Sequence, residues 1–285
     1  MVRTRVTLGL LLSAAVLLLA WLDSQLAGGP VLHILVGITM VAALLEVYAL
    51  AEARGDEPLK LLPVALVVLF VALDYAARVS GDAALGEPAP RGSAMLLSFY
   101  APMGLAVAAG LVALALLQLV ARHPQRWFAS APVTSFGFLY VWFFGAHVLA
   151  IRGMGMGYVL ALIAVAKFGD AAAYFVGSHW GRHRLAPATS PKKSVEGAVG
   201  GLAGGVIAAL VAAWLFRLEG GVGFWVVFGL AVGVAAQAGD LVASAIKRSA
   251  GAKDSGRLLP TFGGILDIVD SPLLGAPVAL WLLAA

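Results

Sequence analysis

Nine apolar runs, separated by short polar connections, occupy most of this 285-residue chain. They lie at about residues 6–22, 31–51, 61–77, 95–120, 132–151, 158–176, 198–216, 222–243 and 272–285. A helix needs about 20 residues to cross a bilayer, and most of the runs approach or reach that length. The last run is short, so it spans only if its helix begins within residues 265–271 or the bilayer is thin. The pattern predicts an all-α, polytopic membrane helical bundle of about nine transmembrane helices.

Composition supports this class of protein. Hydrophobic residues make up 61% of the chain and charged residues only 12%, which is about half of the charged share of a soluble domain. Cysteine is absent, so disulfides, thiolate metal sites and cysteine nucleophiles are excluded. Arg3 and Arg5 precede the first run, which is long for a cleaved signal peptide, so we expect an uncleaved first helix.

The distribution of lysine and arginine predicts the orientation. With the N-terminus in the cytoplasm, 14 of the 19 Lys and Arg residues face the cytoplasm and 4 lie in outer loops. We therefore expect a multi-pass protein of the inner (cytoplasmic) membrane, with the polar connections 177–197 and 244–271 on the cytoplasmic side. We divide the chain into N-terminal transmembrane helices at 1–157 and a C-terminal catalytic membrane region at 158–285, which holds both connections.

The segment 239–271 carries eight of the chain's 34 charged residues, although apolar runs flank it. Such charges are costly beside hydrocarbon unless they are paired, hydrated or bound to an ion. If the preceding helix continues, one of its faces carries Asp240, Ser244, Lys247 and Arg248. Asp267 and Asp270 share a face before the last run, so three carboxylates would meet at two helix ends and suit Mg²⁺. This favours metal-assisted transfer at a phosphorus centre; the alternative is an ion-pair network that closes a helical hairpin.

The connection 177–201 is strongly basic, with Glu196 as its one acid. Pro191 indicates a turn that leads into the next helix, which Ser194 would cap with Glu196 in its first turn. Free N–H groups at such a helix start, beside Lys192 and Lys193, would bind phosphate. Taken alone, however, the segment favours the alternative, a basic loop that contacts anionic lipid headgroups loosely.

Some ionisable residues lie inside the apolar runs. We expect Glu46 to lie near a helix end and to be hydrated there. For Asp74 two interpretations remain equally open: hydration near a helix end, or a position in the lining of a polar cavity. Lys167 and Asp170 are three residues apart on one helical face and are expected to pair. Because this pair adjoins the basic connection, a role at the site is favoured over a purely structural clasp.

Two segments match, in order, the signature of a known family. The later one matches at Gly239-Asp240-Leu241, Ser244, Lys247-Arg248, Lys253-Asp254, Gly256, Leu259-Pro260, Gly263-Gly264, Leu266-Asp267 and Asp270-Ser271. The earlier one matches at Asp170, Ala173-Tyr174-Phe175, Gly177, Leu185-Ala186-Pro187, Ser190-Pro191, Lys193-Ser194 and Glu196-Gly197. From about residue 167 to the C-terminus, the chain resembles the phosphatidate cytidylyltransferases, also called CDP-diacylglycerol synthases.

The resemblance implies an integral membrane enzyme that joins CTP and phosphatidate into CDP-diacylglycerol and pyrophosphate with Mg²⁺. A second, monovalent cation and a homodimer are left open by the resemblance, and no nucleic-acid partner is expected. By this likeness, the metal centre would be formed by Asp240, Asp267 and Asp270. Lys247 and Arg248 would join these aspartates in catalysis, and the residues that bind CTP would also include Ser190, Lys193, Glu196, Lys253 and Asp254.

The chain departs from the family pattern at four positions. Ala243 stands where the family usually has Glu, Thr261-Phe262 replace Gly-His, and Ile268 replaces Arg. These changes put the rate or the acceptor in doubt. They keep open the CTP-dependent activation of a different lipid phosphate, such as a polyprenyl or ether-lipid phosphate. An inactive or transporting membrane protein of the same fold is the remaining alternative.

Overall fold

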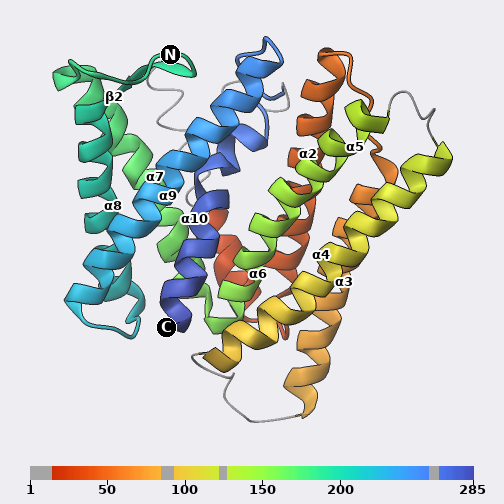
Figure 1. The fold of residues 1–285 in the computed structure, drawn as a ribbon. Helices are drawn as coiled ribbons and strands as arrows, with labels where there is room; N and C mark the ends of the chain where they lie inside the picture. Colours follow the sequence, from red (N-terminus) through yellow and green to blue (C-terminus); the bar gives the residue numbers. More distant parts are fainter. Residues whose placement is uncertain (1–14, 85–92, 122–126, 257–262) are drawn as a thin grey trace.

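A computed structural model of the chain describes residues 15–84, 93–121, 127–256 and 263–285 (Figure 1). The elements on the N-terminal side are α2 (Pro30–Ala53), α3 (Leu61–Ala84), α4 (Ser93–Ala121), α5 (Trp127–Phe138), the π-helical turn η2 (Leu139–Phe143) and α6 (Phe144–Met154). They are followed by α7 (Met156–Trp180), β1 (Arg184–Ala186), β2 (Ser190–Ser194), α8 (Val195–Phe216), α9 (Val222–Ser249) and α10 (Leu266–Ala284).

The helices confirm the predicted polytopic membrane bundle. Within the described ranges, seven helical segments are long and apolar enough to cross a membrane, and α5, η2 and α6 together form one of them. Two shorter apolar helices, Ala15–Ser24 and Met103–Leu117, lie in further predicted runs, so the predicted count of about nine is close. The last helix begins at Leu266, within the segment that the sequence required for a full span.

The C-terminal helix α10 joins two hydrophobic clusters. Leu266 and Leu273 pack in a cluster with residues of α2, α3 and η2, whereas Ala276 and Leu280 pack with α6, α7, α8 and α9. In Figure 1, α10 (dark blue) accordingly lies in the middle of the bundle. Side chains on α10 therefore face both halves of the molecule.

Helices α7 and α8 pack closely through small residues. A Cβ atom placed on Gly204 would overlap the Cβ of Ala172, and one placed on Gly200 would overlap Val176. Such close approach is typical of membrane helices, in which small side chains let backbones touch. This contact holds the C-terminal half of α7, which includes Asp170, against the first half of α8.

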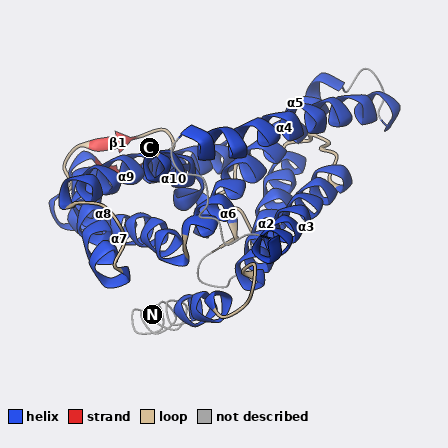
Figure 2. Ribbon diagram, turned by 90° about the horizontal axis from the view of Figure 1, so that it is seen from below, coloured by secondary structure: helices blue, strands red, loops and turns tan. Residues whose placement is uncertain are grey.

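One end of the bundle carries the hairpin of β1 and β2 and the connection between α9 and α10; we call it the polar end. The hairpin is antiparallel and pairs Ala186 with Ser190 (Figure 2 shows β1 at the margin of a molecule that is nearly all helix). Arg248 on α9 donates to the carbonyl of Thr189, which ties α9 to the hairpin at 3.4 Å. Arg54, which follows α2, donates to Ser249 Oγ at 3.4 Å, so α2 also ends here.

The opposite end is held by partly buried ion pairs. Asp74 accepts from Arg78 Nε at 2.7 Å and lies 2.9 Å from His33 Nε2. Asp23 is fully buried and accepts from Arg152 Nε at 2.6 Å. Asp74 thus belongs to a structural network that joins α2 and α3, far along α3 from the polar end.

Candidate functional site

Three aspartates from three helices face one another near the polar end. Asp170 lies on α7, Asp240 on α9 and Asp270 on α10, and their carboxylates interact electrostatically with one another. The hydroxyl of Ser271 lies 2.9 Å from Asp170 Oδ2 and 3.2 Å from Asp270 Oδ1, so it bridges two of them. We call Asp170, Asp240 and Asp270 the aspartate site.

Two lysines partly neutralise this site. Lys193 reaches from β2 and places its Nζ 2.5 Å from Asp240 Oδ2. Lys167, one turn before Asp170 on α7, places its Nζ 3.5 Å from Asp170 Oδ2, so the predicted pair is confirmed. Two ammonium groups against three carboxylates leave the site one negative charge in excess when all are ionised. Carboxylates this close together repel one another, so the site favours the binding of a further cation.

Glycine brings Asp240 beside Asp270. A Cβ on Gly239 would overlap the carbonyl oxygen of Asp270 and would lie 3.2 Å from the Cβ of Leu274. Only glycine therefore lets the backbones of α9 and α10 meet at this level. The position directly before Asp240 is thus decisive for the geometry of the site.

Asp267 is engaged in a different set of contacts. Its carboxylate accepts from Lys247 Nζ at 2.5 Å, from the Ser255 backbone N–H at 2.9 Å and from the Gly264 N–H at 3.0 Å. These donors fold the connection between α9 and α10. Of the predicted metal ligands, the structure brings Asp240 and Asp270 together, whereas Asp267 is turned to Lys247 and the connection. In the ranges that the structure describes, no three His, Cys, Asp or Glu side chains form a ready-made metal cluster.

Glu46 reaches the same connection from α2, and the expectation that it is hydrated is wrong. It is only 6% exposed, and its carboxylate accepts from Ser255 Oγ at 2.7 Å, Ile265 N at 2.8 Å and Leu266 N at 2.9 Å. The first N–H groups of a helix have no partner within it and attract a carboxylate. Glu46 therefore caps α10 from the N-terminal half of the chain.

The basic connection is ordered by its own acid. Glu196 accepts from the backbone N–H groups of Arg182 and His183 at 3.0 and 3.2 Å, and lies 2.6 Å from His183 Nδ1. Ser194 Oγ accepts from Gly197 N at 3.1 Å, which confirms the predicted cap of α8. The hairpin is thereby fixed in the position from which Lys193 reaches Asp240.

Other predicted site residues lie around this end. Ser190 begins β2, Arg248 donates to the hairpin, and Lys253 and Asp254 are exposed in the turn after α9. Ile268 is in the first turn of α10, and Ala243 is fully buried on α9. The remaining departures from the family pattern, Thr261 and Phe262, lie outside the described residues.

Tyr140 is part of the site's surroundings that the sequence did not reveal. It is 4% exposed, lies in the π-helical turn η2 and interacts electrostatically with Asp240 and Asp270. Its ring stacks on Phe136 with centroids 5.6 Å apart. Single π-helical turns are frequent at functional sites because they redirect side chains. No sequence signal marks such a turn.

Together, the fold and the site define an integral membrane protein with a polar centre of aspartates and lysines built between transmembrane helices. The chain belongs to the cytidylyltransferase family, whose model matches residues 3–285. This membership confirms the family resemblance found in the sequence.

Individual relatives match the chain over shorter regions. It is 38% identical over 152 residues to a phosphatidate cytidylyltransferase of Brucella suis biovar 1 (strain 1330), which is 52% of this chain and 56% of that protein. It is 34% identical over 129 residues to a phosphatidate cytidylyltransferase of Staphylococcus aureus (strain COL), which is 45% of this chain and 49% of that protein. The matched region thus spans about half the length of these relatives.

Proposed function

We propose that the protein transfers the cytidylyl group of CTP to phosphatidate and forms CDP-diacylglycerol and pyrophosphate. The observation that carries this proposal is the aspartate site, in which Lys193 and Lys167 accompany three carboxylates between membrane helices. Membership of the cytidylyltransferase family and the names of the two relatives support the choice of nucleotide and acceptor.

The donor chemistry of the site suits Mg²⁺. This ion binds through one or two carboxylates and takes its remaining ligands from water and substrate phosphates. Asp240 and Asp270 are the side chains we assign to it, and Asp170 would balance its charge from α7. When bound, Mg²⁺ would stabilise the negative charge that develops on phosphate oxygens. We assign Asp267 a positioning role, because its contacts hold Lys247 and the connection.

The chain's own residues then bind and orient the two anionic substrates. Lys193, Lys247 and Arg248 come from two elements at the polar end and would hold the triphosphate by charge-assisted hydrogen bonds. A phosphatidate oxygen attacks the α-phosphorus of CTP in line, so a new P–O bond forms while the bond to the β-phosphate oxygen breaks. The attacking phosphate is already an anion, and pyrophosphate leaves with its electron pair, so no strong general base is required.

We further propose that the polar end faces the cytoplasm from the inner membrane. The excess of lysine and arginine in the connections at this end supports that orientation. CTP would reach the site from the cytoplasm, whereas the chains of the lipid would stay in the bilayer.

One residue of the chain favours a different lipid phosphate as the acceptor. Ile268 in the first turn of α10 is apolar where the family usually has Arg, so a different lipid phosphate is the alternative substrate. The test is to incubate purified protein with labelled CTP, Mg²⁺ and, separately, phosphatidate, polyprenyl phosphate or an ether-lipid phosphate. We expect CDP-diacylglycerol from phosphatidate. Product with another acceptor alone would support the alternative, and no nucleotide-lipid product from any acceptor would refute the enzyme.

A further inference from the structure

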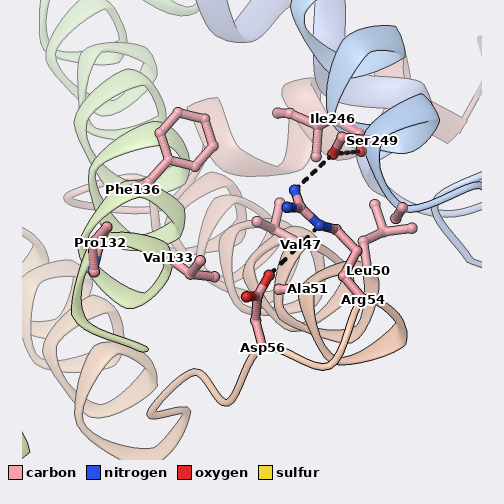
Figure 3. Close-up of a pocket in the computed structure, with 11 residues that line it drawn as sticks. Val47, Leu50, Ala51, Arg54, Asp56, Pro132, Val133, Phe136, Ile246 and Ser249 are labelled. Carbon is pink, nitrogen blue, oxygen red and sulfur yellow. Dashed lines mark hydrogen bonds and ion pairs between the residues drawn. The ribbon is translucent and has the colours of Figure 1, made fainter. Parts of the chain in front are cut away.

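A mostly apolar groove opens at the polar end between α2, α5 and α9 (Figure 3). Its volume is about 240 Å³, and its apolar walls include Val47 and Leu50 from α2, Val133 and Phe136 from α5, and Ile246 from α9. All three helices belong to segments long and apolar enough to cross a membrane. In the orientation proposed above, we place the groove at the boundary between the acyl chains and the headgroups of the bilayer.

The groove is also lined by a cationic side chain, that of Arg54. Arg54 immediately follows α2, and half of its side chain is exposed. Its Nε lies 3.7 Å from Asp56 Oδ2 and its Nη1 lies 3.4 Å from Ser249 Oγ, as Figure 3 shows. Both distances are long for hydrogen bonds to a guanidinium, which has five N–H donors in a planar fork. Arg54 thus has the capacity to bind a phosphate with two parallel hydrogen bonds.

The groove adjoins the aspartate site. Phe136, on the wall of the groove, stacks on Tyr140, with their ring planes 8° apart. Tyr140 in turn interacts electrostatically with Asp240 and Asp270. Ile246, on the opposite wall, directly precedes Lys247 in α9. One aromatic pair therefore separates an apolar groove from the polar centre.

We infer that this groove is the docking site of the acceptor lipid, with one acyl chain along the wall of α2, α5 and α9 and the phosphate on Arg54. The inference rests on the proposed function for the identity of the lipid. Its ligand is a phosphomonoester with an acyl chain, because the walls are apolar and the long contacts of Arg54 to Asp56 and Ser249 leave its guanidinium N–H donors able to bind a phosphate. A nucleotide would leave these walls in contact with water.

Photo-crosslinking tests the inference without requiring turnover. Purified protein in phosphatidylcholine nanodiscs is labelled with phosphatidate that carries a diazirine in its acyl chain, and the labelled peptides are identified by mass spectrometry. We expect label on peptides of α2, α5 or α9 that line the groove. Unlabelled phosphatidate should remove it, whereas added phosphatidylcholine, which lacks a phosphomonoester, should not. Label elsewhere, or equal competition by both lipids, would overturn the inference.

Two matched pairs of variants refine the test. Val133→Trp fills the groove, and Val68→Trp makes the same change on α3 at a side chain that is 54% exposed. Arg54→Gln removes the cation, and Arg217→Gln makes the same change at the end of α8 opposite the polar end. We expect Val133→Trp and Arg54→Gln to lower specific crosslinking about tenfold, since one charge-assisted phosphate contact or a blocked groove accounts for such a factor. The controls should lower it less than twofold, and equal loss within each pair would contradict the inference.

Activity separates this inference from the proposed function. With dioleoyl phosphatidate, Val133→Trp should raise the KM for the lipid about tenfold and leave the KM for CTP unchanged. With dihexanoyl phosphatidate, which has little chain to place, Val133→Trp should behave as wild type. Groove labelling by a wild-type protein that makes no CDP-diacylglycerol would support the docking site and refute the proposed reaction. Turnover with unchanged lipid KM in both groove variants would support the reaction and refute the docking site.

Discussion

The carboxylate of Glu46, toward the C-terminal end of the chain's second predicted span, accepts a hydrogen bond of 2.9 Å from the backbone N–H of Leu266, the first residue of α10. The same carboxylate binds Ser255, whose hydroxyl also lies 3.1 Å from Asp267. A residue of the N-terminal half therefore holds the connection that leads to Asp270. The two halves of the chain are coupled at the place where the site is built.

Replacing Glu46 should destabilise the protein. In Glu46→Gln one carboxylate oxygen becomes an NH₂ group, which cannot accept from the N–H groups at the start of α10. We expect a loss of about 1–3 kcal/mol in the free energy of unfolding, the cost of leaving a buried donor without a partner. Thermal unfolding in detergent measures it. Glu52→Gln on the same helix, where the Glu pairs with Lys60 at an exposed site, is the control, with an expected loss of about 1 kcal/mol at most. Equal losses would contradict the capping role.

Lys193 and Lys192 are neighbours with different surroundings, which makes them a matched pair. Lys193 Nζ lies 2.5 Å from Asp240, whereas the side chain of Lys192 is exposed on the hairpin. Lys193→Gln should raise the KM for CTP about tenfold or more, because a charge-assisted contact is lost near the phosphates. Lys192→Gln should change it less than twofold. Steady-state kinetics at varied CTP checks the prediction, and similar effects of both changes would indicate only a diffuse basic surface.

Asp267 and Asp270 should respond differently to Mg²⁺. Asp270→Asn removes a proposed ligand and should shift the Mg²⁺ concentration for half-maximal activity upward about tenfold. Asp267→Asn weakens the contacts of this side chain with Lys247 Nζ and the Ser255 N–H. It should therefore lower kcat but leave the Mg²⁺ dependence near that of wild type. Magnesium titrations of both variants at saturating CTP measure this. An upward shift with Asp267→Asn would restore that residue to the metal centre.

Gly239 should not tolerate a side chain. Its Cβ would overlap the carbonyl of Asp270, so Gly239→Ala must push α9 away from α10. We expect a loss of about 1–3 kcal/mol in stability, together with low activity, from this overpacking. Gly223→Ala makes the same change in the first turn of α9, where no atom lies within 4 Å, and should be neutral. A normal level of activity in Gly239→Ala would show that the two backbones need not meet there.

The sequence was sufficient for contacts that follow from local spacing. Apolar runs predicted the spans, Ser194 was predicted as a cap, and Lys167 was predicted to pair with Asp170; each depends on residues within a few positions of one another. The polarity of segment 239–271 also marked the end of the bundle where the site lies.

Contacts between distant helices could not be predicted in this way. Spacing placed Asp267 and Asp270 on one helical face, but it did not reveal that Asp267 would be drawn to the N–H groups of the connection. Glu46 looked like a residue near water because its partner lies 220 residues away in the chain. The position of the Tyr140 side chain depends on a π-helical turn, and such a turn has no compositional signature.

Cytidylyl transfer at the aspartate site requires a different fate for each phosphate of CTP, so labelled CTP provides a decisive measurement. Purified protein is incubated with phosphatidate, Mg²⁺ and CTP labelled at either the α- or the γ-phosphate, in parallel with Asp270→Asn. We expect α-label in the lipid product, γ-label in pyrophosphate, and a rate lowered about a hundredfold or more in Asp270→Asn. Label from the γ-phosphate in the lipid, or an undiminished rate in Asp270→Asn, would contradict it.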